Sequence, residues 1–115
     1  AKAPLIDVAV VVAEGRKYPT ALLFPDFDVL ASLKATQKMS HLSDEEFVQT
    51  ELVRSQMNQL FETINQKLNK WEKILDYRIV IHHLTIEDGD LTPSMKVRRE
   101  PVEKKFAHVI NSMYI

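Results

Sequence analysis

The chain has 115 residues and a mass of 13.3 kDa, and its 45% hydrophobic and 27% charged residues are typical of one globular domain. Fifteen basic residues against sixteen acidic residues give a net charge of -1, so no global field draws the chain to nucleic acid or to an anionic membrane. The absence of cysteine excludes disulfides, a thiol nucleophile and cysteine-based zinc sites. The two glycines, Gly15 and Gly89, are too few for a P-loop or a G-x-G-x-x-G dinucleotide motif.

We expect no secretory leader at the start of this sequence. The apolar stretch at 5–13 is interrupted by Asp7 and lacks the basic flank of a secretory leader. No apolar run approaches the roughly 18 residues of a membrane span. The cytoplasm is therefore the default compartment. Because the first residue is Ala1 rather than Met, we expect a processed product or a piece excised from a longer protein.

The first quarter of the chain predicts an antiparallel hairpin. A β-branched run at 6–12 and a second apolar run at 20–24 are predicted strands, and Glu14-Gly15-Arg16-Lys17 is the turn between them. Pro25 ends the second strand because its ring removes a ladder donor.

Two helices are predicted next. Asp26 is placed to cap a short helix over 28–38, and a loop follows at 39–42. Ser43 and Glu46 form a capping box at the start of a long helix. Apolar residues then recur at the three-and-four spacing of one buried stripe, namely Phe47, Leu52, Val53, Met57, Leu60, Phe61, Ile64, Leu68 and Trp71.

The rest of the chain predicts a third strand at 74–83, an exposed loop or hairpin at 85–94 with a tight turn at Asp88-Gly89, and a last helix from Pro101. The predicted fold class is α+β, with a small sheet of about three strands packed by the long helix and the C-terminal helix. The last helix is expected to bury Val102, Phe106, Val109, Ile110 and Met113.

One stretch of the chain is rich in cations and could bind an anion. A charge run at a helix start is more often a solvated face, so that interpretation is favoured. Phe106 is the only aromatic residue near this stretch, and single-stranded nucleic acid binds where several aromatic side chains stack on bases, so such binding is poorly supported. The run gathers Lys96, Arg98, Arg99, Lys104 and Lys105 against Glu100 and Glu103.

Histidines give no metal motif. His82 and His83 are adjacent, so on a strand they face opposite sides and cannot both bind one metal. His41 and His108 are isolated, and no H-E-x-x-H spacing occurs. Structural or surface roles are favoured for all four, and no metal site is predicted.

Other catalytic signatures are also missing. No serine stands in a nucleophile elbow, and Trp71 is expected in the core. Paired carboxylates for acid and base work are not identified, because Glu87, Asp88 and Asp90 are expected in a solvated turn.

Two stretches carry a resemblance to a known family. The stretch 10–27, V-V-V-A-E-G-R-K-Y-P-T-A-L-L-F-P-D-F, resembles the C-terminal domain of long-chain acyl-CoA synthetases, the fatty acid:CoA ligases of the adenylate-forming superfamily. The stretch 87–99, E-D-G-D-L-T-P-S-M-K-V-R-R, is similar to the closing segment of that family, with a Val-x-x-x-Phe helix and Met-Tyr after it. The likeness runs from about Ile6 to the C-terminus. It implies a small mobile lid domain with the element order predicted above.

The resemblance assigns residue roles. In that family a lysine at the end of the motif reaches the active site during adenylation, and the matching residue is Lys96. Gly89, Thr92 and Pro93 match the motif turn. Met95 stands where the wider superfamily has a small residue, a difference associated with the long-chain branch. Weaker candidates for contacts with CoA phosphates or with a large domain are Arg98 and Arg99, for which a solvated role is at least as well supported.

The resemblance also implies a larger enzyme. Its N-terminal domain would carry the phosphate loop, the adenine pocket and the fatty-acid tunnel, and neither that domain nor the hinge motif expected before Leu5 is in this sequence. The substrates would be fatty acid, ATP and CoA, with Mg²⁺ expected in the full enzyme, which would be cytoplasmic or peripheral at a membrane. All 115 residues are thus expected to form a single lid domain that alone neither binds ATP tightly nor turns over.

A different class of function stays open at this point. The chain could be a free-standing interaction module that binds a protein or an anionic ligand through its sheet face or its basic turn. Nucleic-acid binding is poorly supported by the net charge of -1.

Overall fold

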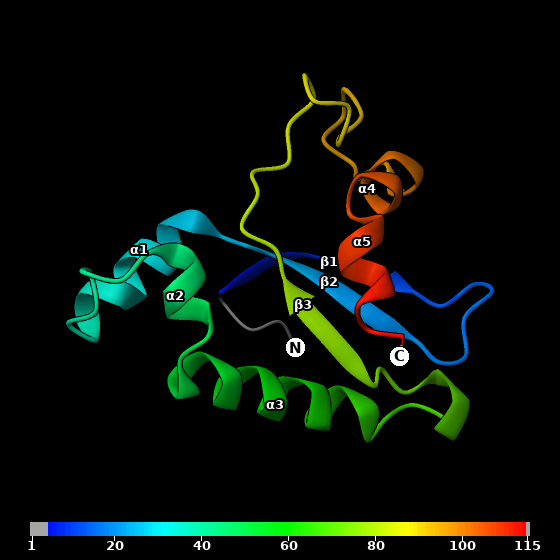
Figure 1. The fold of residues 1–115 in the computed structure, drawn as a ribbon, viewed down its shortest axis with the longest axis horizontal. Helices are drawn as coiled ribbons and strands as arrows, with labels where there is room; N and C mark the ends of the chain where they lie inside the picture. The colour runs from blue at the N-terminus through cyan, green and yellow to red at the C-terminus, as the bar shows by residue number, and fades with distance from the viewer. Residues whose placement is uncertain (1–4, 115) are drawn as a thin grey trace.

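A three-stranded mixed sheet forms the centre of the computed structural model, which describes residues 5–114. Strand β1 (Ile6–Val12) pairs antiparallel with β2 (Thr20–Pro25), and β3 (Asp76–Ile79) pairs parallel with β2 on its other side (Figure 1). The predicted hairpin and the third strand are confirmed.

Strand β3 is shorter than the predicted range 74–83, for a reason visible at its end. The Val80 amide still donates to Leu23 O of β2 at 2.8 Å, but the His82 amide donates to Val80 O at 3.0 Å. This local turn takes the chain away from the sheet, so His82 and His83 lie beyond the strand rather than on it.

Two predicted helix starts are confirmed. Helix α1 (Phe27–Thr36) begins at Asp26, whose carboxylate accepts the amides of Asp28 and Val29. Helix α2 (Asp44–Val48) begins with the capping box of Ser43 and Glu46. Both caps satisfy amides that the first helical turn leaves without a backbone partner.

The single long helix predicted from Ser43 to Trp71 is wrong. The helix is interrupted at Thr50, whose backbone is extended and whose hydroxyl donates to Phe47 O at 2.7 Å. A new helix, α3 (Glu51–Asn65), begins at the next residue. A threonine hydroxyl that bonds to the backbone competes with the helix in this way. At the other end, the Asn65 side-chain amide bonds to both the N–H and the C=O of Ile74, each at 2.9 Å.

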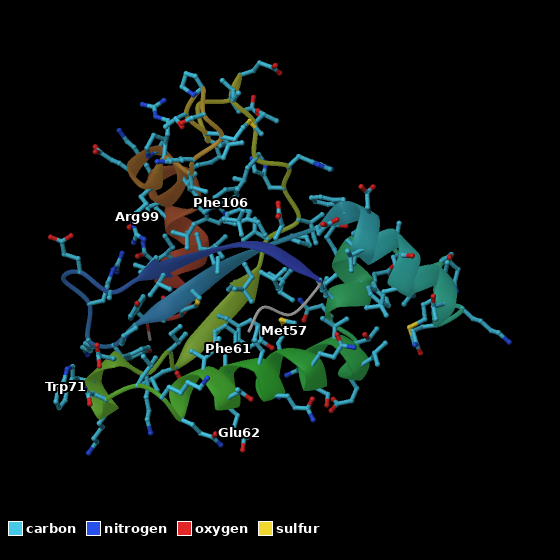
Figure 2. The ribbon with its side chains drawn as sticks, turned by 180° about the vertical axis from the view of Figure 1, so that it is seen from behind. Met57, Phe61, Glu62, Trp71, Arg99 and Phe106 are labelled. Carbon is cyan, nitrogen blue, oxygen red and sulfur yellow. The ribbon has the colours of Figure 1, made fainter. Side chains whose placement is uncertain are left out.

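Trp71 is therefore not a core residue. It lies in the short 3₁₀ turn η1 (Lys70–Glu72), after the end of α3, so the helical period that predicted its burial no longer applies there. Its side chain is 76% exposed and projects from a corner of the molecule (Figure 2).

The C-terminal helix is also split. Helices α4 (Arg99–Lys105) and α5 (Ala107–Asn111) meet at Phe106, where φ is -106°. Pro101 is the third residue of α4 rather than the start, and it fits because first-turn amides have no intrahelical acceptor. Within residues 5–114, no helix is both long and apolar enough to cross a membrane.

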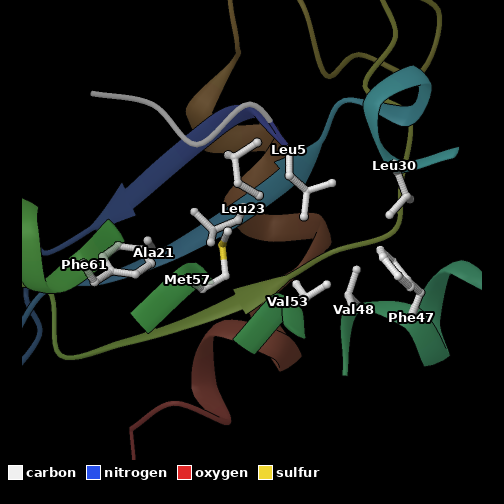
Figure 3. Packing of buried hydrophobic residues seen from close by; sticks show 10 residues of the cluster. Leu5, Ala21, Leu23, Leu30, Phe47, Val48, Val53, Met57 and Phe61 are labelled. Atoms are coloured by element: carbon white, nitrogen blue, oxygen red, sulfur yellow. The ribbon is translucent and has the colours of Figure 1, made fainter. Parts of the chain in front are cut away.

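Strand β2 feeds two separate cores. All its residues are buried, and its side chains alternate, with Ala21 and Leu23 facing one way and Leu22 and Phe24 the other. Figure 3 shows the first core, which β2 forms with α1, α2 and α3. The second core lies beneath α4 and α5 and holds Val10, Val12, Leu22, Phe24, Val102, Ile110 and Met113.

The first core predicts a matched pair of stability changes. Met57 is fully buried on α3 and Met95 is 63% exposed. We expect Met57→Ala to lower the free energy of unfolding by about 2–5 kcal/mol through lost burial and a cavity, and Met95→Ala to change it by about 0.5 kcal/mol or less. Urea unfolding followed by circular dichroism measures both. Equal effects would show that Met57 is not a core residue.

Candidate functional site

A first turn after β3 is fixed by Thr85 and Gly89. The amides of Asp90 and Leu91 donate to Thr85 O at 3.1 and 3.2 Å, and the Gly89 amide donates to Ile86 O at 3.0 Å. Gly89 has φ of +80°, a left-handed conformation that glycine adopts without strain. The predicted tight turn at Asp88-Gly89 is confirmed.

A second turn presents Lys96, and we call residues 91–97 the motif loop. The Met95 amide donates to Thr92 O at 2.8 Å across Pro93, which suits the second position of a turn. Thr92 closes the loop twice, because its amide donates to Lys96 O at 2.8 Å and its hydroxyl accepts the Lys96 amide at 3.1 Å. Leu91 and Val97 form an antiparallel bridge at its base.

Met95 holds an unusual backbone conformation in this loop. Its φ is +67°, in the left-handed region where a residue with a Cβ is strained by about 1 kcal/mol. The small residue expected at this position in the wider superfamily would relieve that strain when it is glycine. The strained geometry persists here because the hydrogen bonds of Thr92 close the loop around it.

Lys96 is exposed at the end of the motif loop. Among residues 5–114, no ion pair involves its side chain. The loop thus fixes the backbone of Lys96 while leaving its ammonium group available to an anion from outside the domain.

The neighbouring arginines are tied into the fold. Arg98 Nη1 donates to Gly89 O at 3.4 Å, bracing the first turn. Arg99, labelled in Figure 2, donates to Val11 O of β1 and lies 3.4 Å from the carboxylate of Glu103 according to its hydrogen-bond and ion-pair geometry. Both side chains remain exposed. These contacts give the arginines a structural use and leave their predicted contacts with CoA or a large domain untested.

Asp90 is not in a solvated turn, contrary to the prediction. Its side chain is fully buried, with Lys105 Nζ 2.6 Å from Oδ1 and His82 Nε2 2.9 Å from Oδ2. The Thr85 amide donates to the same Oδ2 at 3.3 Å. Lys105 was predicted on the solvated face of the basic stretch, but its ammonium group pairs with Asp90 and so links α4 to the first turn.

The protonation of this network follows from its contacts. Burial by itself raises the pKa of the Asp90 carboxyl, but the hydrogen bonds from Lys105, His82 and the Thr85 amide hold that pKa below its ordinary value of 3.8. A carboxylate only accepts, so His82 Nε2 carries the proton that it shares with Asp90.

One grouping of possible metal ligands includes these residues. Ligand atoms of His82, Asp88 and Asp90 lie within 4.8 Å of one another. The ammonium of Lys105 already pairs with Asp90 at 2.6 Å and would repel a cation at the same carboxylate. We therefore interpret the grouping as an internal ion-pair network rather than as a metal centre.

A groove of about 540 Å³ borders the motif loop at Met95. The rings of Phe27 and His83 stack in its wall with centroids 3.6 Å apart. Among the described residues that line it are three aspartates and no lysine or arginine, a charge pattern that disfavours a phosphate ligand. The groove is therefore poorly suited to hold a phosphate group beside Lys96.

The Asp90 network predicts a stability change with a definite pH dependence. Asp90→Asn is expected to lower the free energy of unfolding by about 1.5–3 kcal/mol at neutral pH, because it removes the charge from buried hydrogen bonds to Lys105 and His82. A depressed pKa in the folded state gives stability above the unfolded pKa that is lost as pH falls through the folded value. The difference between wild type and variant should therefore shrink as the pH falls below the ordinary carboxyl value of 3.8.

Urea unfolding across this pH range is the measurement, and Asp88→Asn is the control because Asp88 is an exposed neighbour. An equal loss in both variants, or a difference that grows on acidification, would contradict the assigned network.

The chain is similar to known proteins along its whole length. The family model for the AMP-binding enzyme C-terminal domain matches residues 1–115. Long-chain-fatty-acid–CoA ligase FadD15 of Mycobacterium tuberculosis is 30% identical over 112 residues, and the Mycobacterium bovis protein of the same name matches equally. The match covers 96% of this chain and 19% of those ligases, so the chain spans about a fifth of their length.

Two solved structures share the fold. The A-PCP didomain of carboxylic acid reductase from Segniliparus rugosus, in complex with AMP, aligns with TM-score 0.68 and 22% identity over 96% of this chain and 14% of that one. The adenylation domain of a Mycobacterium chelonae carboxylate reductase aligns with TM-score 0.64 and 17% identity over 96% of this chain and 16% of that one. The predicted α+β fold is confirmed, and the chain belongs to the AMP-binding enzyme C-terminal domain family.

Proposed function

We propose that this chain is the C-terminal lid domain of an ATP-dependent long-chain fatty acid:CoA ligase and that Lys96 is its adenylation lysine. The observation that carries the proposal is the motif loop, whose hydrogen bonds fix the Lys96 backbone and leave its exposed ammonium outside every ion pair among residues 5–114. The acyl-CoA ligase activity rests on the relative of that name at 30% identity.

The chemistry gives such a lysine a clear task. In the first half-reaction a carboxylate oxygen bonds to the α-phosphorus of ATP, the bond to pyrophosphate breaks, and acyl-AMP forms. Negative charge then concentrates on the carboxylate, the phosphate oxygens and the leaving pyrophosphate. One compact ammonium group can neutralise and align these oxygens.

The second half-reaction needs different surroundings. The CoA sulfur bonds to the acyl carbon, AMP leaves, and acyl-CoA forms. Lys96 sits on a short, internally bonded loop rather than within the sheet. A rotation of the whole domain could therefore deliver the lysine for the first step and withdraw it for the second, as the family resemblance implies.

The remaining parts of this enzyme are assigned to an N-terminal domain. We propose that ATP, CoA, fatty acid and the expected Mg²⁺ bind mainly there, since the groove beside Met95 has an acidic lining unsuited to phosphate. Gly89, Thr92 and Pro93 would act through the loop geometry. Arg98, which donates only a long bond to Gly89 O, is better placed than Arg99 to contact CoA or the large domain.

Replacing the lysine tests the proposal in the full-length protein. Lys96→Ala should lower the rate of acyl-AMP formation from fatty acid and ATP by about 10²–10³-fold, because one electrostatic contact in the transition state is lost. Thioester formation from preformed acyl-AMP and CoA should stay near the wild-type rate. Pyrophosphate release and acyl-CoA formation report the two half-reactions.

Lys104→Ala is the matched control, because Lys104 is an exposed lysine in the same basic stretch. It should leave both half-reactions unchanged. Survival of both half-reactions in Lys96→Ala would contradict the assignment and return the basic stretch to a solvated role.

The isolated chain gives a separate test. Without the proposed N-terminal domain, residues 1–115 should show no tight ATP binding in isothermal titration calorimetry and no acyl-AMP formation, while the full-length protein shows both. Turnover by the isolated chain would contradict the lid proposal, and tight ATP binding without turnover would favour the free-standing module that binds an anionic ligand.

A further inference from the structure

The corner of the molecule around Trp71 exposes large apolar side chains. Trp71 is 76% exposed in η1, and Leu75, just before β3, is 63% exposed. Figure 2 shows the Trp71 side chain pointing away from the body of the protein. Exposing this much apolar surface at one corner is unfavourable in water, so a partner that covers it would gain stability.

A second segment lies against this corner. The Leu75 amide donates to Pro19 O at 3.0 Å, which joins the approach to β3 to the loop between β1 and β2. We call residues 67–75, with Pro19 beside them, the Trp71 corner.

The Trp71 corner is basic although the whole chain has a net charge of -1. Three lysines outnumber the one acidic residue, Glu72, and the adjacent Asp76 is paired with Arg78 at 3.0 Å. The Glu72 carboxylate accepts the Asn69 amide at 3.2 Å, so it also serves as a helix cap. The lysines of the corner are Lys67, Lys70 and Lys73. Arg16 lies elsewhere, because its guanidinium donates to Asn111 at 3.2 Å and stacks over the Tyr114 ring.

We propose that the Trp71 corner is a docking surface for an anionic lipid bilayer. An indole ring is stable at the level of lipid headgroups, where its apolar face is buried and its N–H stays hydrated. Lysine side chains around it can lay their methylene stems on the surface and pair their ammonium groups with anionic headgroups. Lysine is depleted from the cores of protein interfaces. Three lysines lie within four residues of Trp71, so this corner suits a lipid surface better than a protein partner.

The position of the corner lets docking and catalysis coexist. The motif loop and η1 lie at opposite ends of the domain, and both views of the molecule agree on this (Figures 1 and 2). A bilayer that covers Trp71 would therefore leave the Lys96 end of this domain uncovered.

Trp71 is also the probe for the first measurement, because it is the chain's one tryptophan. With the 115-residue chain, whose fold circular dichroism verifies, we expect Trp71 emission to shift to the blue when phosphatidylcholine vesicles with phosphatidylglycerol are added. Pure phosphatidylcholine vesicles should give a much smaller shift. Vesicle co-sedimentation then gives the partition constants.

Two pairs of variants with equal charge change separate the corner from general electrostatics. Lys70→Ala with Lys73→Ala should weaken partitioning roughly 25-fold, about fivefold for each lysine. Lys38→Ala with Lys104→Ala, at exposed lysines outside the corner, should have little effect. Trp71→Ala should weaken partitioning by about tenfold.

Absence of binding to anionic vesicles would overturn the proposal, as would equal losses in the two double variants. A lipid-free blue shift that grows with chain concentration would assign Trp71 to a protein interface instead. The inference does not depend on the ligase activity: loss of acyl-AMP formation in Lys96→Ala tests one end of the domain, and vesicle binding tests the other.

Discussion

The structure depends on one constraint, the burial of β2 on both faces. Every residue of Thr20–Pro25 is shielded from water, so each face of the sheet must be covered. The chain covers the first face with α1, α2 and α3 before it returns as β3, and the second with α4 and α5. The motif loop lies in the connection between β3 and α4, and Val97 at its base packs against the second core.

The contacts of Asp90 make the base of the motif loop rigid. A buried carboxylate must be paired, and its partners come from the segment after β3 and from α4. The loop is thereby fixed at its base by Asp90 and closed at its tip by Thr92. For the proposed lid, this matters because a stiff loop moves with the domain, so that the position of Lys96 would be set by domain rotation rather than by loop motion.

Several local signals in the sequence predicted their structures well, and contacts between residues far apart in the chain explain two of the failures. The caps at Asp26 and Ser43 and the turn at Gly89 depend on residues within four positions, so their patterns predicted the helix starts and the turn. The end of α3 depends instead on Asn65 bonding to Ile74, nine residues on. Likewise, the burial of Asp90 depends on partners 8 and 15 residues away, a spacing that no periodic pattern encodes.

A net charge near zero conceals how the charges are distributed. Mobile ions screen exposed charges over about 8 Å at physiological ionic strength, which is short beside the 42 Å length of this molecule. The cations near Lys96 and those near Trp71 therefore act as separate local fields, and the acidic lining of the groove beside Met95 does not cancel either. An anion bound at one end of the domain therefore changes the electrostatic potential at the other end very little. The two proposed contacts, with a reacting phosphate and with a lipid surface, are for this reason electrostatically independent, and what couples them is the rigid fold between them.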